Sequence, residues 1–141
     1  MTGPTASVVI ATYNRPEYVA TCLEHLDRQT VAPVRIIVVD ASPGSETRDV
    51  VSGHPVAEYR RNEAGRGSTA TSRAIGIEGI EEDVVAFIDD DAFASPTWLE
   101  GLLEPYADPT VGGVGGRADN DRPGEEHEGL GQVGLLLPDG R

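Results

Sequence analysis

The sequence predicts an α/β domain with a mostly parallel sheet flanked by helices. Two observations carry this prediction: short apolar runs rich in β-branched residues alternate with helical patterns, and polar residues follow each run. Alternation of strand and helix is typical of parallel sheets, because parallel strands need a crossover connection. At 141 residues the chain is long enough for one domain with its own core.

The first strand and helix have clear signals. Residues 7–11 read Ser-Val-Val-Ile-Ala, an apolar run that suits a buried strand. The next helix is predicted to begin near Asn14, which can cap it, with Pro16 in the first turn and Glu17 completing a capping-box spacing. An apolar face then recurs at helical spacing and includes Cys22, the single cysteine.

The middle of the chain repeats the pattern with weaker signals. A second buried strand is expected at 34–39, ending at Asp40, and a short helix at 45–51 follows a Ser-Pro-Gly turn. Residues 56–59 are less apolar, so the third strand is predicted nearer an edge of the sheet. A glycine-rich segment then leads into a helix predicted at 69–77.

Residues 84–91 are the most informative stretch of the chain. Val-Val-Ala-Phe-Ile predicts a strand at 84–88 buried on both faces, and it runs into Asp89, Asp90 and Asp91. Side chains alternate along an extended segment, so Asp89 and Asp91 are expected to point the same way. Adjacent carboxylates repel one another unless a cation or hydrogen-bond donors lie among them. The pair therefore indicates a site for Mg²⁺ or Mn²⁺, hard cations that prefer oxygen ligands.

The last part of the chain changes character. A helix is predicted at 96–106 and a last strand at 111–114, although glycines weaken the strand signal. Residues 117–141 are polar and glycine-rich, and we interpret them as a loop or the start of an acceptor region, with a short strand at 134–137. The domain therefore looks truncated after its acidic half.

Composition narrows the range of partners. The chain has 24 acidic residues against 11 basic ones, all arginine, and its net charge of -13 argues against nucleic acid or an anionic membrane surface. A phosphate-bearing substrate would need a metal or locally placed arginines. One cysteine and no visible leader or membrane span predict a cytoplasmic location.

Polar side chains that follow the predicted strands are expected to meet at the carboxyl edge of the sheet, where open α/β folds bind ligands. Residues 12–15 follow the first strand, Asp40 the second and the acidic triplet 89–91 the fourth. Arg73 lies on the helix after the glycine-rich segment 65–67, where a helix N-terminus favours an anion. Plainer alternatives stay open: a strand-end cap at Asp40, a surface ion pair at Arg73 and an acidic turn at the triplet.

Together these segments resemble the family 2 glycosyltransferases, whose GT-A fold is a Rossmann-like, mostly parallel sheet flanked by helices. The segments that carry the resemblance are Val-Val-Ile-Ala-Thr-Tyr-Asn-Arg at 8–15, Ile-Val-Val-Asp at 37–40, the Asn-Glu-Ala-Gly segment and following arginine-bearing helix at 62–76, and Phe-Ile-Asp-Asp-Asp at 87–91. The resemblance implies a single domain over 1–141, with the nucleotide-sugar-binding core at 7–116.

The resemblance also implies roles for individual residues. The implied nucleotide-sugar contacts are Thr12, Tyr13, Arg15, Asp40, Arg73, Asp89 and Asp90. The first four surround the nucleoside base, Arg73 lies near the diphosphate or sugar, and the two aspartates lie near ribose and sugar. Asp91, together with Asp89, is implied to hold the Mg²⁺ or Mn²⁺ that bridges the diphosphate.

The implied activity is metal-dependent transfer of a sugar, of the hexosyl type, from a UDP-, GDP- or dTDP-sugar to a hydroxyl of a saccharide, lipid or small molecule, with inversion. No base motif follows the triplet, so the catalytic residue is unknown. One alternative is a non-catalytic or incomplete sugar-nucleotide-binding module. The other is a haloacid-dehalogenase-like phosphatase with Asp89 as nucleophile, although its motif usually opens the chain and a lysine assists, which this chain lacks.

Overall fold

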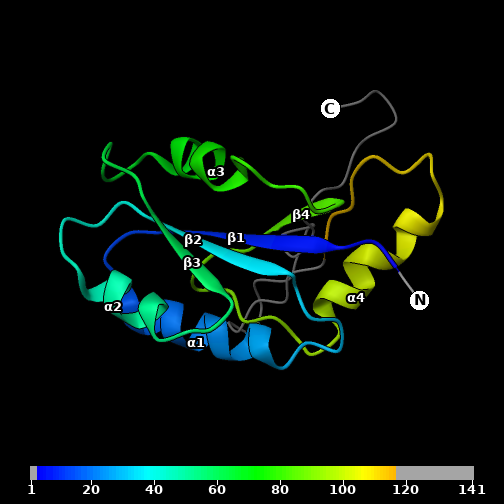
Figure 1. Cartoon of the computed structure of the whole chain (residues 1–141), viewed down its shortest axis with the longest axis horizontal. Helices are drawn as coiled ribbons and strands as arrows, with labels where there is room; N and C mark the ends of the chain where they lie inside the picture. Colours follow the sequence, from blue (N-terminus) through cyan, green and yellow to red (C-terminus); the bar gives the residue numbers. More distant parts are fainter. Residues whose placement is uncertain (1–2, 117–141) are drawn as a thin grey trace, which may run out of the picture.

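The computed structural model describes residues 3–116, which form a four-stranded parallel sheet with helices on both faces (Figure 1). The strands are β1 (Ala6–Thr12), β2 (Arg35–Asp40), β3 (Ala57–Arg61) and β4 (Val84–Phe87). Their order across the sheet is β3-β2-β1-β4, so the chain builds outward from β1 and then crosses to its other side. Such a reversal is the topological switch point at which open α/β sheets bind ligands.

Helices cover the two faces unequally. On one face lie α1 (Pro16–Asp27), α2 (Glu46–Ser52) and α4 (Trp98–Leu103), which continues into the 3₁₀ helix η1 (Glu104–Ala107). On the other face, α3 (Thr69–Ile77) is the only helix among residues 3–116 (Figure 1). The predicted α/β class with a parallel sheet flanked by helices is therefore confirmed.

Alternation along the central strands divides the core into two clusters. Val8 and Ile10 of β1 belong to the larger cluster beneath α1, whereas Val9 belongs to the smaller cluster beneath α3. A Cβ atom on Gly76 of α3 would lie 2.4 Å from Cγ1 of Val9. The helix therefore rests against β1 at a distance that only glycine permits.

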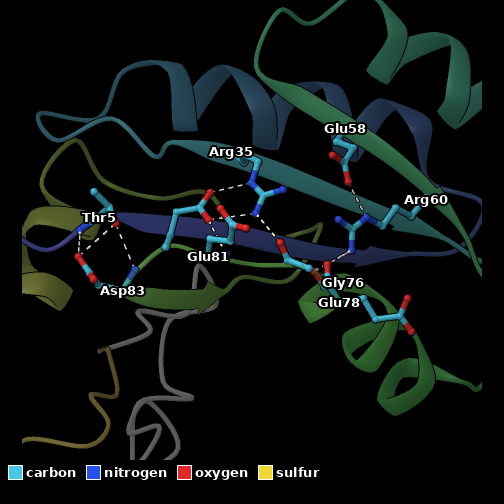
Figure 2. A network of polar contacts seen from close by, with 10 residues as sticks. Thr5, Arg35, Glu58, Arg60, Gly76, Glu78, Glu81 and Asp83 are labelled. Atoms are coloured by element: carbon cyan, nitrogen blue, oxygen red, sulfur yellow. Dashed lines mark hydrogen bonds and ion pairs between the residues drawn. The ribbon is translucent and has the colours of Figure 1, made fainter.

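A polar network joins the amino end of the sheet to the end of α3 (Figure 2). Arg35 on β2 donates from Nε to Oε1 of Glu82 at 2.6 Å and from Nη2 to Oε2 at 3.0 Å. Arg60 on β3 donates from Nη1 to the carbonyl oxygens of Gly76 at 3.3 Å and Glu78 at 2.8 Å. These bonds hold α3 and the turn before β4 to the two strands.

The first four predicted strand positions agree with the structure to within about two residues, and the third strand lies at an edge of the described sheet as expected. The prediction that the fourth strand is buried on both faces is wrong. Among the described residues β4 pairs only with β1, and Phe87 near its end is 45% exposed. An apolar run of β-branched residues fits an edge strand covered on one face as well as a central one.

The predicted cap of the first helix is also wrong. Arg15 occupies the N-cap position, and no side chain caps the helix by a hydrogen bond. Asn14 instead adopts a positive φ of 52°, a conformation that asparagine tolerates. Its backbone N–H donates to Oγ of Ser42 at 2.7 Å, so this residue makes the turn that sends Arg15 back over the sheet edge.

The predicted end of the domain differs in two ways. The helix predicted at 96–106 is divided into α4 and η1, because Pro105 has no N–H to continue an α-helical ladder. Residues 111–114 form no strand, consistent with the low strand propensity of their two glycines. The interpretation of 117–141 and the short strand within it lie outside the described residues. Within 3–116 no helix is long and apolar enough to cross a membrane.

Candidate functional site

An open pocket of about 470 Å³ lies at the carboxyl edge of the sheet. Four segments line it: the end of β1 with the turn that follows, Ala41 after β2, the loop that begins α3, and the acidic triplet after β4. Of the residues predicted to form the site, six line this pocket: Thr12, Tyr13, Arg15, Asp89, Asp90 and Asp91. Asp40 and Arg73 lie near it without lining it.

Asp90 is the most firmly held carboxylate of the triplet and is only 6% exposed. Thr12 donates from Oγ1 to its Oδ2 at 2.8 Å, and Arg15 donates from Nη1 to its Oδ1 at 3.3 Å. Burial raises the pKa of Asp90, and the neighbouring carboxylates add to the rise, while the Thr12 hydroxyl and the Arg15 charge oppose it. Asp90 is therefore a fixed acidic group in the pocket wall.

Asp89 and Asp91 keep more of their surface in solvent. The Asp91 side chain is 53% exposed, and Nη1 of Arg15 lies 3.3 Å from its Oδ2. The Asp89 side chain is 73% exposed, and Nη2 of Arg73 lies 3.8 Å from its Oδ1. Two arginines thus form the ion pairs of three carboxylates, so some carboxylate oxygens in the pocket stay accessible.

Asp89 and Asp91 were predicted to point the same way on an extended segment, but this segment is not a strand. Strand β4 ends at Phe87, and the N–H of Ala92 donates to the carbonyl oxygen of Asp89 at 3.1 Å, which closes a turn around Asp91. Both side chains nevertheless reach the same pocket.

A divalent cation could find two exposed carboxylates at this pocket, Asp89 and Asp91. Across residues 3–116 no group of three or more His, Cys, Asp or Glu side chains is arranged to hold a metal ion. Oxygen ligands of a phosphate and water would have to complete the shell, which is how Mg²⁺ usually binds. The donor set fits a cation that is shared with a phosphate-bearing ligand.

Asp40, which the resemblance implies as a contact of the nucleoside base, makes two hydrogen bonds within the protein. It is fully buried, its Oδ1 accepts the backbone N–H of Ser42 at 2.9 Å, and its Oδ2 accepts the Tyr59 hydroxyl at 2.6 Å. Burial raises the pKa of Tyr59, and the bond to Asp40 adds to the rise, so the hydroxyl stays a donor. The adjacent Ala41 lines the pocket, and contact of Asp40 with a base remains a prediction.

The glycine-rich segment before α3 was predicted to favour an anion, but Ser68 and Ser72 were not among the predicted site residues. Buried Asn62 donates from Nδ2 to Oγ of Ser68 at 2.8 Å and of Ser72 at 2.9 Å, and both serines line the pocket. Gly65 and Gly67, with φ of 75° and 83°, shape the loop that leads from Asn62 to Ser68. The run of small hydroxyl residues after the glycines was the signal available in the sequence.

Cys22 lies directly behind the triplet. Its Sγ is 3.9 Å from the carbonyl oxygen of Asp89, and the side chain is buried in the core. Burial first, and then the three aspartates, raise the pKa of this thiol to about 12. A thiol that stays protonated is a poor nucleophile, in agreement with its predicted packing role.

Comparison with known proteins gives a consistent result. Residues 7–135 match the model of the family described as Glycosyl transferase family 2. The chain is 36% identical over 116 residues to the glucosyl-dolichyl phosphate glucuronosyltransferase of Haloferax volcanii, which covers 78% of this chain and 37% of that protein. The chain spans about a third of the length of the curated relatives it matches.

Solved structures of the same kind are similar in fold. The mannosyltransferase PcManGT from Pyrobaculum calidifontis, in complex with GDP-Man and Mn²⁺, aligns with a TM-score of 0.68 at 22% identity, covering 79% of this chain and 34% of that one. S. aureus TarS in complex with UDP aligns with a TM-score of 0.61 at 24% identity, covering 69% and 30%. These likenesses confirm the predicted GT-A type of fold.

Proposed function

The chain belongs to glycosyl transferase family 2, and on this premise we propose that it transfers a sugar of the hexosyl type from a nucleotide-diphospho-sugar to an acceptor hydroxyl, with inversion and a divalent cation. One observation supports the proposal above the others. Side chains from the ends of β1 and β4 converge with the start of α3 on a single acidic pocket at the switch point of the sheet.

The pocket suits the donor in size and in charge. Its volume of about 470 Å³ lies within the usual range of roughly 300–1,000 Å³ for small-molecule sites. Thr12, Tyr13 and Arg15 line the pocket and are proposed to contact the nucleoside. Asp89 and Asp90 also line it and are proposed to contact the ribose and the sugar. The hydrogen bond between Thr12 and Asp90 fixes this wall before any ligand binds.

The diphosphate is the difficult partner for such an acidic pocket. We assign the Mg²⁺ or Mn²⁺ site to Asp91 with Asp89, in line with the Mn²⁺ in the PcManGT complex. When bound, the cation neutralises the charge that develops on the leaving diphosphate. Arg73, held at the rim by Asp89 and by the ring of Phe87, supplies a further cation for the phosphates.

In the transfer step the acceptor oxygen forms a bond to the anomeric carbon while the bond from that carbon to the diphosphate oxygen breaks. Attack from the opposite face inverts the centre, and the acceptor proton passes to a general base. No base is assigned among residues 3–116. The acceptor, and whether the base of the donor is uracil, guanine or thymine, are left to experiment.

Calorimetric titration with UDP, GDP and dTDP, each with Mn²⁺ and with EDTA, tests the donor site. Binding of one nucleotide only with metal would support the proposal and name the base. Release of that nucleoside diphosphate from its sugar in the presence of acceptors would establish transfer. Absence of metal-dependent binding to all three nucleotides would contradict the donor site.

Metal-dependent binding without turnover would instead identify a sugar-nucleotide-binding module. The family match argues against the phosphatase alternative. We also propose a cytoplasmic location, as expected from the composition.

A further inference from the structure

Resting on this proposed function, we propose that Arg15 is an internal counter-ion of the acidic triplet, which a divalent metal must displace before the site can take its donor. Its role would then differ from the base contact implied by the resemblance. The assignment makes Arg15 a positioning residue that couples metal binding to nucleotide binding.

The geometry of the Arg15 guanidinium is the first argument. A single nitrogen, Nη1, lies 3.3 Å from Oδ1 of Asp90 and 3.3 Å from Oδ2 of Asp91. It therefore sits between two adjacent carboxylates, as a bridging cation does. A metal ion at Asp91 and the guanidinium would compete for the Asp91 carboxylate, and their like charges would repel each other.

The local fold holds Arg15 in this place. As the N-cap of α1, it follows directly on the positive-φ turn at Asn14, so its backbone leaves the sheet edge in a fixed direction. Its guanidinium carbon lies 5.8 Å from the ring centroid of Tyr18, within the range of a cation–π contact. The Tyr18 ring is in turn nearly parallel to that of Phe93, with centroids 6.4 Å apart.

The charge balance of the pocket is the second argument. Among the described residues, Arg15 is the one cation within 4.0 Å of Asp90 and of Asp91, while Arg73 reaches only Asp89. The chain carries a net charge of -13 and no lysine, so only another arginine or a protonated histidine could replace this charge. Without Arg15, two adjacent carboxylates would face each other uncompensated, unless a metal were bound.

Displacement gives Arg15 a second use. Its side chain is 48% exposed and lines the pocket, so a guanidinium released from the carboxylates stays beside the ligand. A phosphate oxygen is then its natural partner. Metal binding would free Arg15 for the nucleotide, and by linkage the nucleotide would tighten metal binding by the same factor.

The experiment is a Mn²⁺ titration without nucleotide, followed by electron paramagnetic resonance of the free ion at constant ionic strength. Arg15→Gln is compared with Arg28→Gln, which removes one charge at the exposed C-cap of α1 and so makes the same change in net charge away from the pocket. We expect Arg15→Gln to bind Mn²⁺ about three- to tenfold more tightly than Arg28→Gln, the range for losing one or two partly exposed ion pairs.

Repeating the titration with the nucleotide that the wild type prefers tests the coupling. In the wild type the nucleotide should tighten Mn²⁺ binding. In Arg15→Gln this gain in affinity should shrink by a factor similar to the difference in Mn²⁺ affinity measured without nucleotide. Arg15→Lys keeps the charge on a side chain without the planar fork, so its Mn²⁺ affinity should lie between those of the wild type and Arg15→Gln. This variant also tests the proposal if Arg15→Gln does not fold.

Equal nucleotide-free Mn²⁺ affinity in Arg15→Gln and Arg28→Gln would overturn the assignment, as would weaker or undetectable binding in Arg15→Gln. These outcomes leave the proposed function standing if the wild type still binds a nucleotide with metal. Conversely, a wild type that binds no nucleotide would refute the donor site, while the nucleotide-free comparison would still decide the role of Arg15.

Discussion

The ion pair at the amino end of the sheet is short and bidentate, whereas the ion pairs at the carboxyl end are longer. At the amino end, Arg35 holds both carboxylate oxygens of Glu82 at 2.6 and 3.0 Å. Close by, the N–H of Thr5 donates to Asp83 at 2.9 Å and the N–H of Asp83 donates back to Oγ1 of Thr5 at 3.1 Å. At the carboxyl end, three aspartates share two arginines at 3.3 to 3.8 Å.

The pKa shifts at the two ends have opposite signs. The bonds from Arg35 lower the pKa of Glu82 to about 2, although burial works against them. Burial raises the pKa of Asp90, and its partners only reduce the rise. The same residue types therefore hold the fold together where they are fully paired, and where they are not they form the pocket that we propose as a ligand site, as perturbed carboxylates in clefts often do.

The largest expected effect is at Asp91. Asp91→Asn removes an anionic oxygen that the donor's cation needs, so we expect metal-dependent nucleotide binding to weaken by about two orders of magnitude. The measurement is calorimetry with Mn²⁺. Asp49→Asn, an exposed aspartate on α2, is the matched control and should bind as the wild type does. Unchanged binding in Asp91→Asn would remove our metal assignment.

The second prediction concerns α3, which connects the two ends. In Gly76→Ala the new Cβ would meet Cγ1 of Val9 at 2.4 Å, so we expect a loss of about 1–3 kcal/mol in the free energy of unfolding. Gly101→Ala on α4 meets nothing within 4 Å and should gain about 0.5–1 kcal/mol from helix propensity. Urea denaturation measures both, and a loss in both variants would contradict the steric explanation.

The third prediction uses pH to examine the amino end. The pKa of Glu82 in the folded protein is about 2, below its ordinary value of 4.5. Its contribution to stability is therefore fully present above about pH 4.5 and is lost as the pH falls toward 2. Denaturation midpoints between pH 2 and 5 should fall less steeply in Glu82→Gln than in the wild type. Equal slopes would mean that the pair with Arg35 does not stabilise the fold.

The smallest expected effect on stability is at Asp90. Because its pKa is raised, ionisation of Asp90 costs the folded state free energy as the pH rises through that pKa. Asp90→Asn removes this cost together with the Arg15 ion pair, so we expect the free energy of unfolding at pH 7 to change by less than about 1 kcal/mol. Nucleotide binding should weaken nonetheless. A loss of more than about 2 kcal/mol in the free energy of unfolding would show that Asp90, like Glu82, stabilises the fold through its partners.

Much of the fold could be predicted because the signals are local. The buried strand β1 appears as a run of apolar residues, and the first helix shows its apolar face through Val19, Cys22 and Leu23, all of them buried. The convergence of Thr12 with Asp90 could also be predicted, since parallel strands bring their carboxyl ends to one edge. Strand order could not, because local sequence does not record which strands pair.

The errors fall where the outcome depends on distant contacts. Asn14 has the composition of a helix cap, but its N–H finds Ser42 and the backbone turns instead. Asp40 ends its strand as predicted, and only the third strand, by bringing Tyr59 within 2.6 Å, decides that its carboxylate is occupied. The exposure of β4 likewise depends on its place at the edge of the described sheet.

The sequence by itself determined the α/β class, the family resemblance and the set of acidic and polar groups at one edge, because each rests on residue order and side-chain chemistry. The tertiary structure alone decided how those groups are paired. Whether Arg15 faces a base or bridges Asp90 and Asp91 is set by the direction in which the turn before α1 leaves the sheet. An ion pair forms only where two charged groups lie close in space. Arg15 is 75 and 76 positions from Asp90 and Asp91 in the sequence, so these groups meet only when the chain folds.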